Sequence, residues 1–239
     1  DSTYLLKIGK EVLGDKAVAI TVNSTVFPQS ECDESISFCE EENIKHIILG
    51  FDELSVEGYA KNSKDRCYIC KKSLFNYIKE AAANEGISTI AEGSNVDDLG
   101  DYRPGLKAIA ELGIKSPLKE AGLRKNEIRL LSKEYNLKTW NKPSFACLSS
   151  RIPYGEKITI EKIRMVEEAE KFLTKLGFIQ KRVRIHGKMA RIEITKDAFA
   201  EIMRDEIRDD IAKEFKKIGF SYVTLDLMGY RTGSLNEVL

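Results

Sequence analysis

The sequence lacks a long apolar run and has no excess of one charge. None of its 239 residues belong to a hydrophobic stretch near the roughly 20 residues that a membrane-spanning helix requires, so we expect no membrane partner. The first residues also lack the basic, apolar and small-residue regions of a secretory leader, and we therefore expect a cytoplasmic protein. Lysine plus arginine and aspartate plus glutamate both total 38. Because phosphate contacts supply most of the affinity for nucleic acid, this balance disfavours RNA or DNA as a partner.

The chain contains few cysteines, and their number is odd. The five cysteines are Cys32, Cys39, Cys67, Cys70 and Cys147. An odd count without a secretion signal argues against a disulfide framework and favours reduced thiols, metal binding or catalysis. Low-complexity segments and internal repeats are also absent. The content of 42% hydrophobic and 32% charged residues is ordinary for a globular protein with a buried core.

The first half of the chain alternates between helical and strand-like patterns. Helices are expected over residues 2–13, 31–43 and 71–85, and short apolar strands over 17–22, 46–50 and 88–91. Such alternation predicts an α/β fold in which a parallel sheet, with its strands buried on both faces, is covered by helices. Ligands of these sheets bind at the carboxyl ends of the strands. Three segments would then surround one crevice: Asn23-Ser24, Phe51-Asp52 and Glu92-Gly93-Ser94-Asn95.

The pattern changes near residue 155. An amphipathic helix is expected over 159–176, followed by strands over 183–186 and 190–194, a charged helix over 205–218 and a strand over 222–227. This second part predicts a small α+β domain. We therefore expect an α/β domain over residues 1–155 and an α+β domain for substrate binding or oligomerisation over 156–239.

The chain opens with Asp1-Ser2-Thr3 directly before a predicted helix. Asp-Ser-Thr by itself is a common helix N-cap. It is also the last part of a Ser-Gly-Gly-x-Asp-Ser loop, in which backbone N–H groups and a helix N-terminus bind pyrophosphate. Both interpretations stay open on these residues, and we expect the Ser-Gly-Gly half of the loop to be omitted or disordered upstream of Asp1.

Three of the cysteines suit a metal centre. Cys67 and Cys70 are placed just before a predicted helix, whose N-terminus favours thiolates. Cys147 lies in a loop-like segment between prolines. A Cys-x-x-Cys pair alone is compatible with redox chemistry or with half of a zinc site. With the third thiol, a zinc site completed by His46 or His186 stays an alternative. A third thiol favours a three-cysteine [4Fe–4S] cluster with one iron that has no protein ligand.

Further strings carry a resemblance over essentially the whole chain. They are Asp1-Ser2-Thr3, Cys67–Cys70, Glu92–Asp98, Asp101–Gly105, Pro143–Gly155 and Gly229–Ser234. Through these strings the chain resembles the LarE family of PP-loop ATP pyrophosphatases, which have an adenine nucleotide alpha hydrolase-like fold. The family makes the thiocarboxylated pyridinium precursor of the nickel-pincer cofactor.

The resemblance implies a reaction and its partners. The enzyme would adenylate a carboxylate of pyridinium-3,5-biscarboxylate mononucleotide with ATP and Mg²⁺, release pyrophosphate and then deliver sulfur. Some relatives sacrifice the cysteine at the position of Cys147. Relatives with three cysteines instead resemble cluster enzymes that use a sulfide donor, and Cys67 and Cys70 group this sequence with them. A homo-oligomer is also expected.

Residue roles follow from the resemblance and from the chemistry of phosphates. Candidates for binding ATP are Asp1, Ser2, Thr3, Val22, Asn23, Ser24 and Gly93, with Asp97 or Asp98 holding Mg²⁺. Arg103 and Arg151 are candidate clamps for a carboxylate or phosphate. Arg182 and Arg184 are expected at the substrate phosphate, with Cys147 and Glu193 as catalytic residues. Each role has an alternative. The aspartates would instead cap helices, and the two clamp arginines would form surface ion pairs. The strand residues Arg182, Arg184 and Glu193 would lie on a solvated sheet face.

Other readings of the sequence stay open. A tRNA thiolation enzyme of the PP-loop type also combines a Cys-x-x-Cys with a third cysteine, although zero net charge argues against it. An ammonia-using PP-loop ligase would not need three cysteines. A non-catalytic zinc-binding module is the third alternative. Cys32 and Cys39 are expected to be small buried hydrophobes, and the single tryptophan, Trp140, is expected to be a packing residue.

Overall fold

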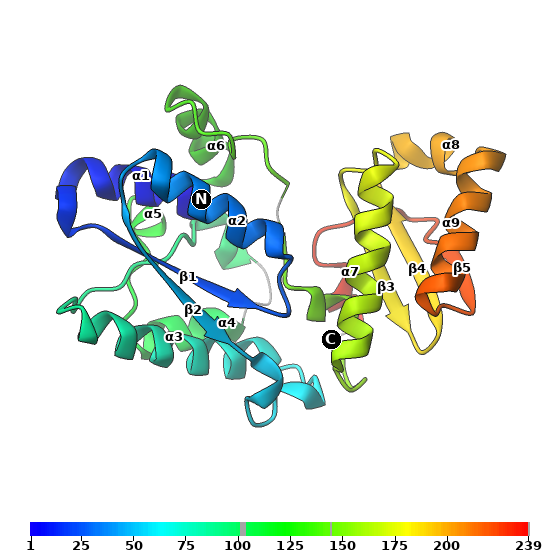
Figure 1. The fold of residues 1–239 in the computed structure, drawn as a ribbon, viewed down its shortest axis with the longest axis horizontal. Helices are drawn as coiled ribbons and strands as arrows, with labels where there is room; N and C mark the ends of the chain where they lie inside the picture. Colours follow the sequence, from blue (N-terminus) through cyan, green and yellow to red (C-terminus); the bar gives the residue numbers. More distant parts are fainter. Residues whose placement is uncertain (101–103, 144, 239) are drawn as a thin grey trace. The chain divides into compact units, whose positions relative to one another are not determined.

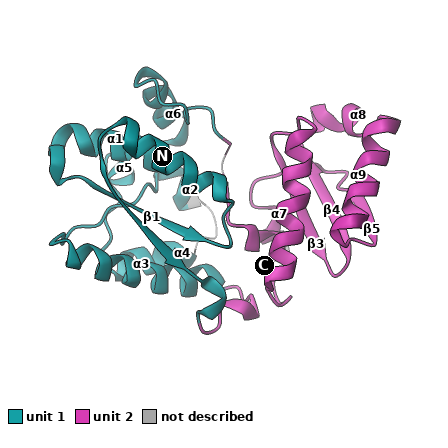
Figure 2. Cartoon of the chain, viewed as in Figure 1, with its two compact units in different colours: residues 1–56, 65–142 teal, residues 57–64, 143–239 magenta. Residues whose placement is uncertain are grey.

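The structure is a computed structural model that describes residues 1–100, 104–143 and 145–238 (Figure 1). The chain divides into two compact units (Figure 2). Unit 1 comprises Asp1–Val56 and Asp65–Lys142, and unit 2 comprises Glu57–Lys64 and Pro143–Leu239. The domain limits expected from the sequence, 1–155 and 156–239, stay a prediction.

Unit 1 has an α/β architecture, as the alternating sequence pattern predicts. Its α-helices and strands are α1 (Ser2–Leu13), β1 (Val18–Ser24), α2 (Gln29–Glu41), β2 (Lys45–Phe51), α3 (Arg66–Asn84), α4 (Pro104–Glu111), α5 (Pro117–Glu120) and α6 (Lys125–Glu134). The strands β1 and β2 pair in parallel, from Val18 opposite Lys45 to Ser24 opposite Phe51. The parallel pairing confirms the predicted α/β fold class.

Helices cover both faces of this sheet (Figure 1). Successive side chains of a strand point to opposite faces, so neighbouring residues of β1 enter different clusters. Ala19 belongs to a cluster with Cys39 of α2, and Ile20 packs against the cluster that contains Phe75 of α3. Cys39 and Cys32 are both buried, as expected for small apolar side chains. Burial raises the pKa of each thiol, so these two cysteines are protonated residues of the core.

Three local predictions for unit 1 are wrong. The strand expected over 88–91 is reduced to one bridge, Ala91 opposite Lys115, because only the residues next to the bridge pair with that segment. The strand β1 is half-buried along most of its length rather than buried on both faces. The helix α3 begins at Arg66, five residues before the predicted start at 71, since no proline or glycine interrupts the stretch after Asp65. Cys67 and Cys70 therefore lie inside the helix, in its first turns.

Unit 2 combines helices with a mixed sheet. Its elements include the 3₁₀-helix η5 (Leu148–Arg151), α7 (Ile160–Lys175), β3 (Lys181–His186), β4 (Met189–Ile194), α8 (Phe199–Ile202), α9 (Asp205–Ile218) and β5 (Tyr222–Leu225). The strand order is β3-β4-β5, with β3 and β4 antiparallel and β4 and β5 parallel. Gly187 has a φ of 57° in the tight turn between β3 and β4, a conformation that favours glycine. The predicted α+β character of this part is confirmed.

The core of unit 2 lies between α7 and its sheet. Thr159 caps α7 by accepting the Lys162 N–H, and the apolar spacing of the helix buries Val166 and Leu173 completely. Val183 of β3 is equally buried beneath the helix. Among the described residues of both units, no helix is long and apolar enough to cross a membrane.

Candidate functional site

In unit 1, the start of α1 lies against the loop that follows the Ala91 bridge. A Cβ atom on Gly93 would come within 2.7 Å of the Ser2 backbone nitrogen and 3.0 Å of its Cα, so only glycine fits there without a shift of the backbone. The side chain of Ser2 is exposed and Thr3 is half-buried. The predicted phosphate-binding residues Ser2 and Gly93 are thus brought together at a helix N-terminus.

The Asp1 side chain is held by two residues from distant segments. Its carboxylate accepts hydrogen bonds from Lys125 Nζ at 2.6 Å and from Asn95 Nδ2 at 3.0 Å. The Asn95 backbone N–H donates in turn to Asp98 Oδ2 at 2.9 Å. Asp1 and Asp98, both predicted site residues, are therefore linked through Asn95. Asn95 ends one of the segments expected around the crevice, whereas Lys125 was not among the predicted site residues.

Asp97 binds to the start of α6. Its Oδ1 accepts from Arg124 at 3.0 Å, and its Oδ2 accepts the Lys125 backbone N–H at 2.8 Å. A carboxylate at this place satisfies an N–H of the first helical turn and interacts well with the helix dipole. Asp97 thus contacts the start of α6 from a distant segment, while the N-cap residue of that helix is Arg124.

The carboxyl end of β1 is occupied by a buried polar pair. Ser24 Oγ lies 2.6 and 2.7 Å from the two carboxylate oxygens of Glu53, which is 1% exposed. Burial raises the pKa of Glu53 above its ordinary value, and the Ser24 hydroxyl opposes this in part. The neighbouring Asn23 is exposed, whereas Val22 packs against the α3 cluster. Of the predicted adenosine-binding residues, Asn23 is thus the one that faces solvent.

Cys67 and Cys70 share one side of α3, because residues three apart on a helix are neighbours. The buried side chain of Arg66 donates to Cys67 Sγ at 3.8 Å. Both thiols are half-buried. In the described residues, no group of three or more histidine, cysteine, aspartate or glutamate side chains is placed to hold a metal ion. Cys147 belongs to unit 2, and the meeting of the three thiols stays a prediction.

The two histidines proposed to complete a zinc site have other surroundings. His46 Nε2 lies 2.8 Å from Thr21 Oγ1 on the neighbouring strand. His186 is half-buried at the end of β3. Burial is the main cause that lowers the pKa of both rings, so each is neutral at pH 7. The ring of His46 is thus held by Thr21 within the sheet of unit 1.

In unit 2, Arg151 anchors the segment that contains Cys147. Its guanidinium forms a two-point ion pair with Glu170 of α7, with Nε–Oε1 2.8 Å and Nη2–Oε2 2.9 Å. Its Nη1 donates to the carbonyl oxygens of Ala146 at 2.6 Å and of Cys147 at 3.1 Å. Arg151 is completely buried, and the surface ion pair considered as an alternative is wrong for this residue.

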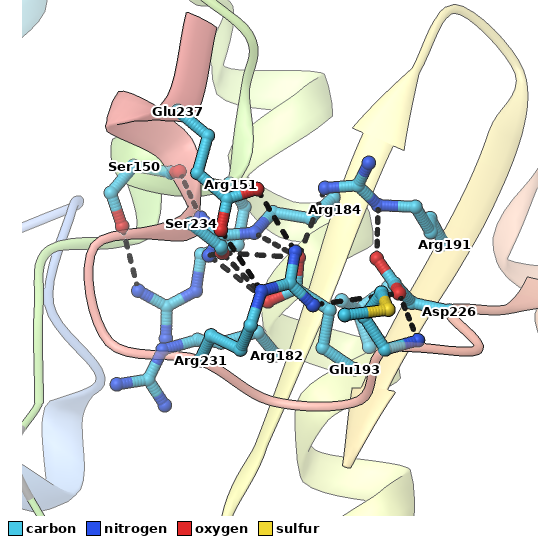
Figure 3. A network of polar contacts seen from close by, with 12 residues as sticks. Ser150, Arg151, Arg182, Arg184, Arg191, Glu193, Asp226, Arg231, Ser234 and Glu237 are labelled. Atoms are coloured by element: carbon cyan, nitrogen blue, oxygen red, sulfur yellow. Dashed lines mark hydrogen bonds and ion pairs between the residues drawn. The ribbon is translucent and has the colours of Figure 1, made fainter.

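Glu193 is the centre of a second buried network (Figure 3). Its carboxylate accepts two hydrogen bonds from Arg184, at 3.0 and 3.1 Å, and one from Arg191 at 3.0 Å. Arg184 also donates to the Ser150 carbonyl oxygen at 2.6 Å and to Ser234 Oγ at 2.8 Å. Arg184 and Glu193 are buried, so the alternative of a solvated sheet face is wrong here. An acid or base role for Glu193 stays a prediction.

Arg182 lies beside aromatic rings. Its guanidinium carbon is 5.2 Å from the ring centroid of Tyr230 and 6.0 Å from that of Phe145, and its Nη1 donates to the Lys181 carbonyl oxygen at 2.7 Å. Burial, followed by the charge of Arg151, lowers the pKa of Arg182 from its ordinary value. These causes disfavour the cation, and an anionic ligand would oppose both of them.

The polar cluster of unit 2 contains more cations than anions. Its five guanidinium groups belong to Arg151, Arg182, Arg184, Arg191 and Arg231, and its four carboxylates belong to Glu170, Glu193, Asp226 and Glu237. Five positive and four negative charges give a net charge of +1 for these nine residues. The arrangement suits an anionic group, and arginine is the side chain that binds phosphate with two donors. Arg103, the other predicted clamp, lies outside the described residues.

Comparison with known proteins adds relatives of the whole chain. No protein-family model matches the sequence. The chain is 40% identical over 239 residues to the uncharacterized protein slr1717 of Synechocystis, covering all of this chain and 89% of that protein. It is 39% identical over 242 positions to the pyridinium-3,5-bisthiocarboxylic acid mononucleotide synthase of Lactiplantibacillus plantarum, covering all of this chain and 86% of that enzyme. A third relative, the uncharacterized protein MJ0830 of Methanocaldococcus jannaschii, is 33% identical over 80% of this chain and 73% of its own length.

Proposed function

Since the chain belongs to the LarE family of sulfur-transferring synthases, we propose that it is an enzyme that uses ATP to convert carboxylates of a pyridinium mononucleotide into thiocarboxylates. The observation that carries this proposal is the similarity over the full chain to an enzyme whose name specifies such a product. The grouping of Asp1, Ser2, Gly93 and Asp98 at the start of α1 supports a nucleotide site in unit 1.

The first step is activation of the carboxylate. A carboxylate oxygen attacks the α-phosphorus of ATP, the bond from that phosphorus to pyrophosphate breaks, and an acyl adenylate forms. Ser2 and the first N–H groups of α1 bind the departing pyrophosphate, where negative charge develops. Adenosine binds at the end of β1, near Asn23. Asp97 or Asp98 holds a magnesium ion, and Asp98 is linked to the start of α1 through Asn95 and Asp1.

The second step is sulfur transfer. A sulfide sulfur attacks the activated carbonyl carbon, the carbon–oxygen bond to AMP breaks, and the thiocarboxylate and AMP are released. Arg182 and Arg184 bind the phosphate of the substrate, and the buried carboxylate of Glu193 fixes the orientation of Arg184. Glu193 remains the candidate for acid or base chemistry once substrate displaces part of its network.

The donor set fits an iron–sulfur cluster in its chemistry. Cys67 and Cys70 present two thiols on one face of α3, and Cys147 is the proposed third ligand. When bound, a [4Fe–4S] cluster with three cysteine ligands supplies an iron that can hold an additional sulfide. Arg66 supports the Cys67 sulfur through its hydrogen bond, and Arg151 holds the backbone on both sides of the Ala146–Cys147 bond.

The test is anaerobic reconstitution with iron and sulfide, followed by incubation with ATP, Mg²⁺, sulfide and pyridinium-3,5-biscarboxylate mononucleotide. We expect mass spectrometry to detect a thiocarboxylate product formed together with pyrophosphate. Iron and inorganic sulfide of about four each per chain are expected before turnover. One zinc with no iron, or a Cys147 that has lost the elements of hydrogen sulfide after turnover, would contradict the cluster mechanism. Formation of thiolated nucleosides in tRNA would indicate the RNA-modifying alternative.

A further inference from the structure

A groove with a volume of about 690 Å³ runs beside α6 in unit 1. It is lined by four basic side chains, Arg124, Lys125, Arg129 and Lys133, together with Asp97 and the ring of Trp140. Trp140, expected to be a packing residue, is 38% exposed. The volume lies within the range of about 300–1,000 Å³ that is typical of pockets for small molecules.

The groove has a strong excess of positive charge. Four cations and the single carboxylate of Asp97 give its lining residues a net charge of +3. Arg124 pairs with Asp97 at 3.0 Å, and Lys125 pairs with Asp1 at 2.6 Å. Within the described part of the chain, Arg129 and Lys133 have no carboxylate within ion-pair distance. In the described ranges, Arg129 donates to the Lys142 carbonyl oxygen, at 3.4 Å.

The basic residues also repel one another. Lys125, Arg129 and Lys133 follow each other at intervals of four residues, which places them on one face of α6. Like charges at this spacing destabilise a helix by a few tenths of a kcal/mol per pair. Burial is the main cause that lowers the pKa of Lys125, and the neighbouring charge of Arg129 adds to it, while Asp98 opposes both. A bound polyanion would relieve the repulsion.

The ring of Trp140 adds a second kind of contact to the groove. The ammonium nitrogen of Lys133 lies 4.9 Å from the centroid of the Trp140 ring. An exposed ring next to cations suits a ligand that joins an aromatic base to phosphates, because bases stack on tryptophan while arginine and lysine bind the phosphates. The size of the groove and the formal net charge of zero for the whole chain favour a single nucleotide over a long nucleic acid.

We propose that the α6 groove is a second site for a nucleotide di- or triphosphate, separate from the site at the start of α1. The phosphates bind between Arg129 and Lys133, and the base stacks on Trp140. The two sites are neighbours, since Lys125 lines the groove and also binds the Asp1 side chain.

Trp140 makes this proposal directly measurable, because it is the only tryptophan of the chain. The full-length protein is titrated with ADP without magnesium while tryptophan fluorescence is recorded. We expect saturable quenching whose apparent Kd rises at least tenfold in Arg129→Gln and in Lys133→Gln. Arg129→Lys, which keeps the charge, is expected to retain most of the affinity. Lys16→Gln, at an exposed lysine elsewhere in unit 1, is the matched control and is expected to change nothing.

Further measurements distinguish binding in the groove from other causes of fluorescence quenching. The Ser2→Ala variant is expected to bind ADP in the groove as the unchanged protein does, since Ser2 belongs to the α1 site. Inorganic tripolyphosphate is expected to bind more weakly than ADP because it lacks the base. The proposal is overturned if quenching is unchanged in both groove variants, if it is lost in Ser2→Ala, if tripolyphosphate binds as tightly as ADP, or if an oligonucleotide binds more tightly than ADP.

Discussion

Arg151 and Glu170 form an ion pair that is joined at two points and closed to solvent, with side-chain exposures of 0% and 8%. Glu170 lies on α7. Arg151 is the last residue of η5, the 3₁₀-helix that begins directly after Cys147. The same guanidinium donates to the carbonyl oxygens of Ala146 and Cys147. The pair therefore ties the segment that contains the proposed catalytic cysteine to the core of unit 2.

Removal of the acid from this pair is expected to destabilise unit 2. In Glu170→Ala, Arg151 becomes a buried cation without its counter-ion, and the Val183 N–H loses its acceptor. We expect the free energy of unfolding to fall by about 3–5 kcal/mol, measured by urea denaturation. Glu167→Ala is the control on the same helix, because its pair with Lys171 is partly exposed and contributes about 1 kcal/mol or less. Equal losses in the two variants would contradict the role assigned to the buried pair.

Cys147 is expected to act after adenylation. Cys147→Ala removes a proposed cluster ligand and sulfur site but leaves the nucleotide residues of unit 1 unchanged. We therefore expect sulfur transfer to be abolished while ATP-dependent pyrophosphate release continues at a similar rate. Cys32→Ala, at a buried cysteine of α2, should retain both activities. Loss of both activities in Cys147→Ala would show that the division between the two steps is wrong.

The elements of the fold that the sequence predicts are those determined by local apolar spacing. The helices α1 and α7 and the strands β1 and β2 follow from apolar spacing, and each lies within a few residues of its predicted range. The start of α3 was missed because Arg66 to Lys71 carry little apolar periodicity, although they contain no residue that breaks a helix. The expected strand at 88–91 has a strand-like composition but pairs at only one position.

The site residues that were missed act through partners that are distant in the sequence. Glu53 meets Ser24 across 29 residues, and Glu170 meets Arg151 across 19. Lys125 reaches Asp1 across 124 residues. No local motif marks these carboxylates or this lysine, since their roles depend on how the elements of each unit pack. Asp97 is the opposite case. Its sequence motif marked it as a candidate site residue, but only the structure shows that it binds the start of α6.

Even a single methyl group at Gly93 is expected to weaken ATP binding. In Gly93→Ala the new methyl group would lie 2.7 Å from the Ser2 nitrogen, so the loop or the start of α1 has to move. We expect ATP affinity, measured by isothermal titration calorimetry, to fall at least tenfold. Gly9→Ala is the control within α1, because no heavy atom lies within 4 Å of its added Cβ. It should bind ATP normally and stabilise the helix by up to about 1 kcal/mol. Normal ATP affinity in Gly93→Ala would argue against a phosphate site at this contact.

Ser2 is expected to affect the nucleotide and not the metal. Ser2→Ala removes an exposed hydroxyl at the start of α1, and hydrogen bonds to charged groups contribute about 1.5–3 kcal/mol. We therefore expect the Kd for ATP to rise about tenfold or more, with iron and sulfide contents unchanged after reconstitution. Ser37→Ala on the exposed side of α2 should match the unchanged protein in both measurements. A loss of iron in Ser2→Ala would contradict the separation of the two sites.

The buried Glu53 is expected to make the stability of unit 1 depend on pH. Burial raises its pKa in the folded protein above the ordinary value of 4.5, so the folded state binds this proton more tightly than the unfolded state does. The contribution to the free energy of unfolding is therefore complete below pH 4.5 and is lost as the pH rises toward the folded pKa. Glu53→Gln keeps a donor and an acceptor toward Ser24 without the ionisation. We expect this variant to gain stability relative to the unchanged protein as the pH rises from 4.5 to 8, measured by urea denaturation at each pH. Glu80→Gln, at an exposed position of α3, should show no such trend. The same pH profile in both variants would mean that Glu53 ionises in the folded protein as easily as an exposed acid.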